Sequence, residues 1–254
     1  MEHGQERLLR DILHDAGKVP DARVRDICRG GHHIMVLSHH AGLSARMYDP
    51  DQGRQKDGAA DDLSGFRGSA LELASGLLRP EGQSRDSVSC ALAAMNSILP
   101  VPGDARRCKG QELIDRYGRG KNVVIVGHFP FVEKMGQGFR RVWVLERYPR
   151  PGDLDAEAAG NVLPRADVVA LTATTLLNGT AAGLLGLVPA HALTIMLGPS
   201  TPFAPCLFDW GIDALSGCSV KDPAGLKLSI QRGGGYHSLQ GTEPFTWVRG
   251  QRTL

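Results

Sequence analysis

Three apolar segments constrain the fold of this chain most strongly: VVIV at residues 123–126, VVAL at 168–171 and LTIML at 193–197. Each is short and apolar at nearly every position, as expected of a strand buried on both faces of a sheet. Turn residues and stretches with helical spacing separate them. Strands that alternate with helices predict a mainly parallel sheet covered by helices. We therefore expect an α/β fold for this half of the chain.

The rest of the C-terminal half continues this alternation. A turn, GHFP at residues 127–130, follows the first apolar run, and a spacer long enough for a helix leads to the next strand. We expect helices at 110–117, in the spacer between the first two strands, and at 154–162, 175–187 and 204–211. We expect strands at 122–126, 142–146, 167–172, 193–197, 212–220 and 226–231.

The first hundred residues have a different pattern, which predicts a smaller α+β part. Apolar residues at helical spacing indicate helices at 5–16, 70–78 and 86–99, and 32–47 is typical of two short strands about a turn containing Gly42. A polar, Gly-rich connection is expected at 49–69. Pro100 and Pro102 end the last helix, and we place the domain boundary there, giving domains at 1–103 and 104–254.

Composition excludes several classes of partner. With 29 basic and 27 acidic residues the net charge is only +2, whereas nucleic-acid binding needs a concentrated positive face. No apolar run approaches the roughly 18 residues of a membrane span, and the charged N-terminal segment is unlike a secretory signal. We expect a cytoplasmic protein that binds neither nucleic acid nor membrane.

Cysteine and histidine spacing gives no metal motif. The five cysteines lie far apart in the chain, which favours reduced thiols: Cys28, Cys90, Cys108, Cys206 and Cys218. His39 and His40 would face opposite sides of a strand, and His33 would lie about 20 Å from His39 along one. The metal ligands therefore remain unknown at this level.

Polar turn residues follow four of the expected strands. The carboxyl ends of parallel strands meet at one edge of a sheet, where small ligands bind. We expect the residues at these turns to surround a single cavity and to contact a ligand: Gly127, Phe129, Pro130, Glu146, Thr172, Thr174, Gly198, Pro199 and Ser200. Taken singly, each block is also typical of turns and helix caps.

Glu146 is the most specific of these residues. An acid about 20 residues past the first turn of such a sheet typically binds ribose hydroxyls; a surface ion pair with Arg141 or Arg147 is the alternative. The first turn is not GxGxxG, and Phe129 and Pro130 would obstruct a pyrophosphate. A ribose-bearing ligand without pyrophosphate, such as S-adenosylmethionine, fits this pattern better than a dinucleotide.

Two polar residues near this edge are candidates for catalysis. His128 is the one titratable group in the first turn, where it could act as general base, hydrogen-bond donor or metal ligand, or simply bind a backbone carbonyl. Asn178 lies one turn into the expected helix at 175–187 and either points toward the crevice or hydrogen-bonds the start of that helix.

The order of the sequence blocks resembles a known family. The blocks GHFPF (127–131), LERYPRPGD (145–153), LPRADVVALTATTLLNGT (163–180), GPSTPF (198–203) and GIDALSGCSVKD (211–222) are similar to the putative heavy-metal chelation family, a domain family of unknown function. The strong resemblance covers roughly 121–235. It implies a Rossmann-like C-terminal half and an N-terminal half similar to the amino-terminal domain of enolase. ALAAMNSIL (91–99) carries the looser N-terminal match and marks Asn96 as a further catalytic candidate.

Two hypotheses follow. In the first, the chain is an enzyme, a transferase or lyase that binds S-adenosylmethionine on the Rossmann-like half and a small substrate between the halves, with Glu146 on the ribose and His128 assisting proton transfer. In the second, it binds a divalent or heavy metal, or a metal complex, in the same cleft without catalysis. The small-molecule ligand is expected in both, and the assembly, including a homodimer, stays open.

Overall fold

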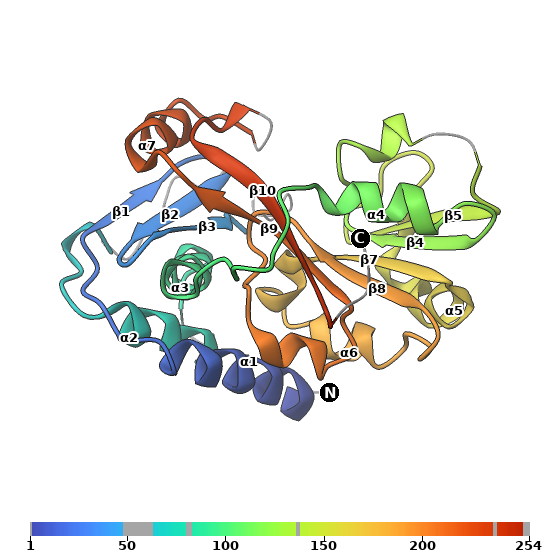
Figure 1. Cartoon of the computed structure of the whole chain (residues 1–254), viewed down its shortest axis with the longest axis horizontal. Coiled ribbons are helices and arrows are strands. Elements are labelled where there is room, and N and C mark those ends of the chain that lie inside the picture. Colours follow the sequence, from blue (N-terminus) through green and yellow to red (C-terminus); the bar gives the residue numbers. More distant parts are fainter. Residues whose placement is uncertain (1, 48–62, 80–82, 136–137, 236–237, 251–254) are drawn as a thin grey trace.

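The computed structural model describes residues 2–47, 63–79, 83–135, 138–235 and 238–250. Within these ranges the chain forms a seven-stranded sheet and a three-stranded sheet with helices packed against both (Figure 1). The predicted polar connection at 49–69 falls mostly outside the described residues. No helix in the described ranges is long and apolar enough to cross a membrane.

The seven-stranded sheet is mainly parallel, as predicted. Its strands are β4 (Asn122–Val126), β5 (Arg141–Glu146), β6 (Leu154–Asp155), β7 (Val168–Thr172), β8 (Leu193–Leu197), β9 (Ala214–Val220) and β10 (Thr242–Val248). Their order is β10-β9-β8-β7-β4-β5-β6, and only β10 runs antiparallel to its neighbour. The chain moves outward in one direction from β4 to β6 and in the other from β7 to β9. The switch point where such sheets bind ligands therefore lies between β4 and β7.

The predicted burial on both faces of these strands is confirmed. Val124, Val169 and Met196 point into one hydrophobic cluster, while Ile125, Ala170 and Ile195 point into another on the opposite face. Helix α4 (Gly110–Tyr117) covers the second face with Leu113 and Ile114. Alternate residues of each strand thus meet different apolar layers, which explains why the segments are apolar throughout.

The three-stranded sheet is antiparallel, in the order β1-β2-β3, with β1 at Asp26–Arg29, β2 at His33–Leu37 and β3 at Ala41–Ala45. Three helices accompany it: α1 (Glu2–Gly17), α2 (Ala70–Ala74) and α3 (Arg85–Ile98). Helix α7 (Pro223–Gln231) packs on β1 and β2 through Leu226 and Ile230. Both halves of the chain therefore build the surroundings of this small sheet.

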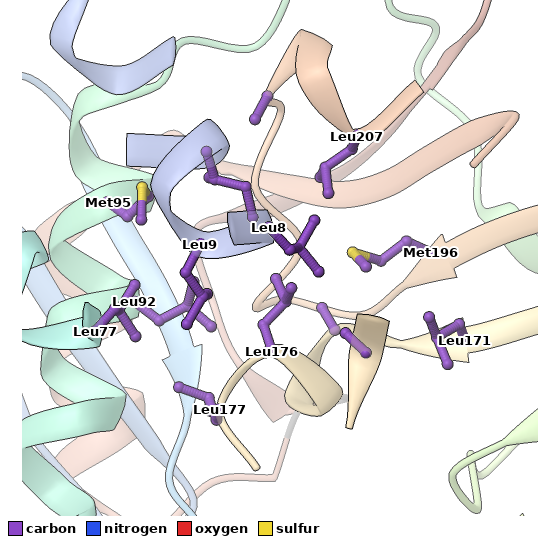
Figure 2. Packing of buried hydrophobic residues seen from close by; sticks show 14 of the residues in the cluster. Leu8, Leu9, Leu77, Leu92, Met95, Leu171, Leu176, Leu177, Met196 and Leu207 are labelled. Atoms are coloured by element: carbon purple, nitrogen blue, oxygen red, sulfur yellow. The ribbon is translucent and has the colours of Figure 1, made fainter. Parts of the chain in front are cut away.

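One hydrophobic cluster joins the two sheets. Leu8 of α1 and Met95 of α3 belong to the same cluster as Leu171 of β7 and Met196 of β8, as Figure 2 shows. Strand β9 also contacts β3. The division into domains at 1–103 and 104–254 and the likeness of the first to enolase stay predictions, but the apolar packing between the two parts is continuous.

Several predicted elements are wrong in type or extent. Residues 226–231 belong to α7 rather than to a strand, because Pro223 and the Asp222 side chain, which accepts from the Gly225 N–H at 3.0 Å, start a helix there. The final strand, β10, was not predicted. It carries Pro244 and lies at the edge of the sheet, where a missing N–H is tolerated.

Other corrections concern helix lengths and a turn. The expected helix between β4 and β5 is, in the described residues, only the 3-10 helix η4 (Val132–Lys134). The expected helix at 175–187 is interrupted at Gly179, whose φ is +77°, between η7 (Ala173–Leu176) and α6 (Ala181–Leu185). The helix expected at 70–78 is formed by α2 and the 3-10 helix η3 (Ser75–Leu78), and the helix expected at 154–162 by η5 (Ala156–Ala158) and α5 (Ala159–Val162). The helix expected at 204–211 is the shorter 3-10 helix η8 (Pro205–Phe208). The 3-10 helices η2 (Leu63–Gly65) and η6 (Leu163–Arg165) were not predicted.

Gly42 does not lie in a turn but within β3. A Cβ at this position would lie 2.1 Å from the carbonyl oxygen of Ala93 and 2.2 Å from the amide nitrogen of Ser97. Only glycine lets β3 approach the backbone of α3 so closely. The turn between β2 and β3 is formed by residues 38–40 instead.

Candidate functional site

A pocket of about 320 Å³ lies where β4, β5 and β7 end. Its lining comes from both halves of the chain: Arg46, Met47, Val126, Gly127, Leu145, Glu146, Arg147, Tyr148, Ala156, Thr172, Thr174, Thr175, Asn178, Thr180 and Leu184. Five of the predicted site residues, Gly127, Glu146, Thr172, Thr174 and Asn178, are therefore brought together. They meet at the switch point of the sheet, as ligand sites of this architecture do.

Gly127 allows the strand ends to approach each other. Its φ is +101°, in the left-handed region that favours glycine. A Cβ there would also lie 3.0 Å from Cγ2 of Thr172, at the end of β7. A side chain at position 127 would therefore strain the backbone and crowd the Thr172 side chain at the pocket.

Glu146 ends β5 with a half-buried carboxylate inside the pocket. Burial raises the pKa of this carboxyl above its usual value, and the nearby charge of Asp153 adds to the effect, while the backbone N–H of His128 donates to the carboxylate and opposes it. A half-buried carboxylate with remaining lone pairs is stabilised by further hydroxyl or N–H donors. The site therefore suits a ligand that presents such donors.

The opposite wall is a short run of hydroxyl and amide groups after β7. Thr172 and Thr174 share a hydrogen bond of 3.1 Å between their hydroxyls. Asn178 accepts from the N–H and hydroxyl of Thr180 through its Oδ1, at 3.2 and 2.6 Å. This bonding leaves its Nδ2 amide without a hydrogen bond to the described part of the chain. Asn178 lies in a turn rather than in the helix predicted for it, but its place beside the pocket agrees with the prediction.

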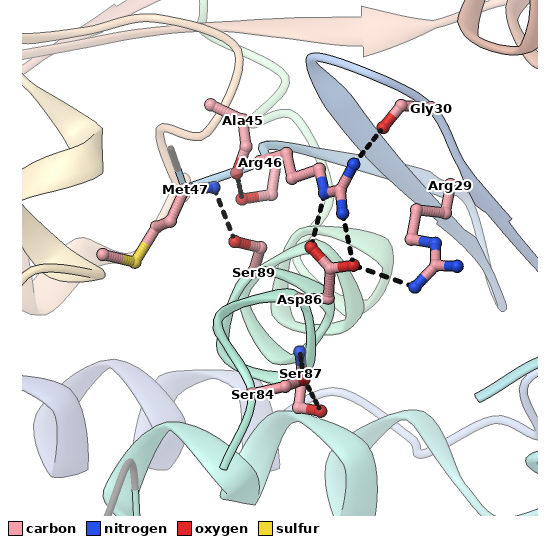
Figure 3. A network of polar contacts seen from close by, with 10 residues as sticks. Arg29, Gly30, Ala45, Arg46, Met47, Ser84, Asp86, Ser87 and Ser89 are labelled. Atoms are coloured by element: carbon pink, nitrogen blue, oxygen red, sulfur yellow. Dashed lines mark hydrogen bonds and ion pairs between the residues drawn. The ribbon is translucent and has the colours of Figure 1, made fainter. Parts of the chain in front are cut away.

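The N-terminal half supplies the remaining wall through Arg46 and Met47, which sequence reasoning missed. Figure 3 shows the network that holds them. Arg46 donates to both carboxylate oxygens of Asp86, at 2.6 and 3.0 Å, and Arg29 donates to one of them at 2.9 Å. The Met47 N–H donates to Ser89 on α3 at 3.2 Å. Only the tertiary contact between the two halves places these residues at the pocket.

His128 follows Gly127 but does not line the pocket. Its Nδ1 lies 2.9 and 3.0 Å from the two carboxylate oxygens of Asp153, and both side chains are buried, at 9% and 3% exposed. Its Nε2 is buried and has no hydrogen-bond partner among the described residues. Sequence reasoning missed Asp153. The only sequence signal is an acid in the Pro-Gly turn after β5, at residues 151–153.

Asn96 and Ser200 hold the two halves together instead of lining the pocket, which corrects the expected site. The Asn96 amide donates to the carbonyl oxygens of Leu43 and Ser200, at 2.9 and 3.1 Å. The Ser200 hydroxyl accepts from the Ala45 N–H at 2.8 Å, and the residue is only 1% exposed. These hydrogen bonds hold the turn after β8 against β3 and α3, away from the pocket, and leave the buried Asn96 Oδ1 without a hydrogen-bond partner among the described residues.

The other expected ligand contacts are also absent from the pocket lining. Gly198 and Pro199 belong to the same turn after β8 and do not reach the cavity. Phe129 stacks on Phe131, with ring centroids 5.2 Å apart, and both rings pack on the cluster beneath α4. Pro130 does not line the pocket either. Apolar packing on the far face therefore draws the GHFPF segment past Gly127 away from the pocket.

A second groove, of about 540 Å³, lies between α1 and η8. Two of its carboxylates already have partners: Asp11 accepts from the Trp210 indole at 2.9 Å, and Asp15 accepts from Lys18 at 2.7 Å. None of its lining residues belongs to a strand. We therefore base the functional argument on the pocket at the strand ends.

The described residues contain no group of three or more His, Cys, Asp or Glu side chains placed to hold a metal ion. Burial raises the pKa of the Cys90 and Cys218 thiols to about 12 and raises those of Cys28 and Cys206 as well. Burial therefore favours the protonated thiol over the thiolate at these four cysteines. None of the five cysteines lines the pocket at the strand ends.

Comparison with known proteins agrees with this architecture. The sequence model of the family described as putative heavy-metal chelation matches residues 111–248. A protein of unknown function from that family in Desulfitobacterium hafniense has a similar structure, with a TM-score of 0.79 and 23% identity over 97% of this chain and 99% of that one. A second protein of unknown function from the same family, in Pyrococcus horikoshii, is similar with a TM-score of 0.76 and 18% identity over 95% of this chain and 100% of that one. Both likenesses concern the fold, and no curated protein matches the chain.

Proposed function

The chain belongs to the family described as putative heavy-metal chelation, and we propose that it is an enzyme that binds an adenosyl-type ligand, S-adenosylmethionine foremost, in the pocket at the ends of β4, β5 and β7. The reaction is of the transferase or lyase type, with a small substrate bound toward Arg46 and Met47. The observation that carries the proposal is the convergence of Gly127, Glu146 and Thr172 on one pocket at the switch point of the sheet.

Glu146 supports a ribose in this pocket. It occupies the end of the second strand of the Rossmann-like order, where an acid binds ribose hydroxyls. Its carboxylate accepts the His128 N–H from one side, and two ribose hydroxyls would satisfy lone pairs that face the cavity. Such bonds would offset the burial that now raises its pKa.

The turn after β4 argues against a dinucleotide. Dinucleotides place their pyrophosphate on the N-terminus of the helix that follows the first strand. Here the described residues after β4 form only the three-residue 3-10 helix η4, and the Phe129 ring packs against the apolar cluster that contains Leu113 and Ile114. The pocket volume of about 320 Å³ also lies at the small end of the usual range for ligand sites, which suits a nucleoside better than a dinucleotide.

Two groups could orient the second substrate. The Asn178 Nδ2 amide donates no hydrogen bond within the described residues, and the partly exposed Tyr148 ring lies on the pocket wall. His128 follows Gly127, which lines the pocket, and its imidazole contacts the Asp153 carboxylate. It is the proton-transfer group of this proposal. Asn96 has no catalytic part in it, because its amide joins β3 to the turn after β8.

Ligand screening by thermal unfolding and calorimetric titration tests the proposal. S-adenosylmethionine or adenosine at 100 times its dissociation constant should add about 2.7 kcal/mol to the free energy of unfolding, and NAD should add none. Glu146→Gln should weaken binding of the adenosyl ligand about tenfold or more, because each ribose hydrogen bond to a charged group is worth roughly 1.5 to 3 kcal/mol.

Asp155→Asn is the matched control. Asp155 is the register partner of Glu146 on β6, but it does not line the pocket. Equal binding by wild type and Glu146→Gln, or stabilisation by metal ions alone with no effect of any adenosyl compound, would contradict the proposal.

A further inference from the structure

Strand β5 has an open edge along most of its length. It lies near one end of the seven-stranded sheet, beyond β4 (Figure 1). Its outer neighbour β6 is only two residues long and pairs with Leu145 and Glu146. In the described part of the chain, residues 141–144 have no strand on that side. An unpaired edge of this kind is a template for another strand.

The backbone of Val142 points toward this open side. The Arg141 N–H donates to the Lys121 carbonyl oxygen just before β4. The Leu145 carbonyl oxygen accepts the Gly127 N–H just after β4. Because successive residues of a strand direct their backbone groups to alternate sides, the N–H and C=O of Val142 point away from β4. Its side chain is 39% exposed, which makes Val142 one of the few exposed large apolar residues of the described chain.

The charge around this edge is strongly positive. The guanidinium carbons of Arg141 and Arg165 lie 5.8 and 5.3 Å from the centre of the Trp143 ring. Four exposed arginines on or near the edge make no ion pair with a described acidic side chain: Arg140, Arg141, Arg147 and Arg165. They carry more positive charge than the net +2 of the whole chain, so the other residues together are net negative. The edge therefore attracts a negatively charged partner.

A second copy of this chain would be a poor occupant of the edge. Two paired β5 edges would bring the same arginines onto both sides of the interface, and like charges that face each other are destabilising. Residues 138–145 contain no aspartate or glutamate that could pair with them. Asp155, on β6, lies opposite Glu146 and thus beyond the open stretch. The charge of the edge favours a different partner, one that supplies acidic side chains.

We propose that the open edge of β5 binds an extended acidic segment of another protein, which adds to the sheet as a further strand. The backbone of this segment pairs with Val142. Alternate residues of a strand face opposite sides, so its acidic side chains meet Arg141 and Arg165 on the face of Trp143, and its apolar side chains meet Val142 on the other face. In strand addition the backbone hydrogen bonds give affinity and the alternate side chains give specificity.

The edge and the pocket at the strand ends are separate sites. None of Arg141, Val142, Trp143 and Arg165 lines that pocket. This proposal and the adenosyl proposal can therefore fail independently of each other.

Fluorescence anisotropy of a labelled peptide tests the proposal. The probe is a synthetic peptide of about eight residues, the length of an ordinary strand, in which glutamate and valine alternate. We expect the full chain to bind it, and to bind a lysine–valine peptide of the same length about tenfold more weakly or less tightly still. The glutamate–valine peptide N-methylated throughout should also lose about tenfold or more in affinity, because it keeps its charge but loses the N–H donors of a strand.

Two variants locate the binding site. Arg141→Glu should bind the glutamate–valine peptide about tenfold more weakly, because it reverses a charge at the edge. Val142→Pro should do the same by removing the outward N–H, and a proline at such an open edge leaves the pairing with β4 intact. Arg232→Glu is the matched control. Arg232 is an exposed arginine at the C-terminal end of α7, far from β5 in the sheet order, and its variant should keep wild-type affinity.

Several results would overturn the proposal. These are absence of peptide binding by wild type up to about 1 mM, equal binding of the N-methylated peptide, and equal weakening by Arg232→Glu and Arg141→Glu. An oligothymidylate of the same charge that binds more tightly than the peptide would identify a nucleic-acid surface instead of a strand-addition site. A dimer that Val142→Pro converts to a monomer in sedimentation would identify a second copy as the occupant of the edge.

Discussion

Nδ2 of Asn96 on helix α3 lies 3.1 Å from the carbonyl oxygen of Ser200, in the turn after β8. The same nitrogen lies 2.9 Å from the carbonyl oxygen of Leu43 on β3. One amide group thus joins a helix and a strand of the small sheet to a turn of the large sheet. This contact fixes the turn after β8 against the N-terminal half and keeps it out of the pocket.

Asn96→Ala should lower the free energy of unfolding by about 2 kcal/mol, because two buried carbonyl groups lose their donor. Asn96→Asp should lower the free energy of unfolding more than Asn96→Ala does, because it places a carboxylate against those two carbonyl oxygens. Urea unfolding measures both changes. Asn178→Ala is the comparison: its hydrogen bonds are local to Thr180, so a loss below about 1 kcal/mol is expected. Equal losses in Asn96→Ala and Asn178→Ala would refute the joining role.

Gly42→Ala should destabilise the fold strongly, by about 3 kcal/mol or more, because the added methyl would lie 2.1 Å from the carbonyl oxygen of Ala93. Either β3 or α3 must move. Gly31→Ala is the control, since a Cβ at Gly31 meets nothing within 4 Å. Thermal unfolding should leave Gly31→Ala close to wild type. A mild effect at Gly42 would show that β3 and α3 are less tightly packed than described.

Asp86→Asn should lower the free energy of unfolding by about 3 kcal/mol. The Asp86 side chain is 11% exposed and accepts charged hydrogen bonds from Arg46 and Arg29, and its loss leaves two guanidinium groups facing a neutral amide. Glu243→Gln serves as control, because its partner Arg107 is 67% exposed and such surface pairs contribute less than about 1 kcal/mol. Denaturant unfolding at constant ionic strength compares the two; similar losses would contradict the prediction.

Stability should fall as the pH drops from about 6.5 to about 4. Burial lowers the pKa of His33 from 6.5 to about 4, and the charge of His32 adds to the effect. In that window the unfolded chain binds a proton that the folded chain does not, so acidification favours unfolding. The contribution is at most about 3.5 kcal/mol, at roughly 1.4 kcal/mol per pKa unit.

His33→Gln should remove this part of the pH dependence, which urea unfolding at pH 7, 5.5 and 4.5 can measure. The difference between wild type and variant isolates His33 from His40, whose pKa is also lowered by burial. A variant whose unfolding free energy changes with pH as steeply as that of wild type would show that His33 does not titrate in the predicted window.

The sequence was a good guide to the large sheet because its strands are buried on both faces. Strands β4 and β8 begin and end at the predicted residues, and the family resemblance is confirmed by the match over 111–248. Helices α3 and α4 also lie where apolar spacing predicts them. In each case the signal is local. The period of the apolar residues, the β-branched side chains and the residues at the ends of each element are enough to predict it.

Elements at the edge were less predictable. The segment that forms α7 has few polar residues because it packs on β1 and β2, and it was predicted as a strand. Strand β10 pairs along its length with β9, forms only an isolated bridge to Arg106 on its other side, and carries polar residues and a proline, so its sequence pattern is weak. Such elements take their form from distant partners, which a short sequence window does not contain.

The local sequence alone determined that Gly127, Glu146, Thr172 and Thr174 share a sheet edge, because the carboxyl ends of parallel strands always meet there. The tertiary structure alone decided that Arg46 and Met47 close the pocket, that Ser200 turns away from it toward Ala45, and that Asp153 holds His128. Those contacts join side chains from separate elements, and their positions depend on how the two sheets pack across a common core.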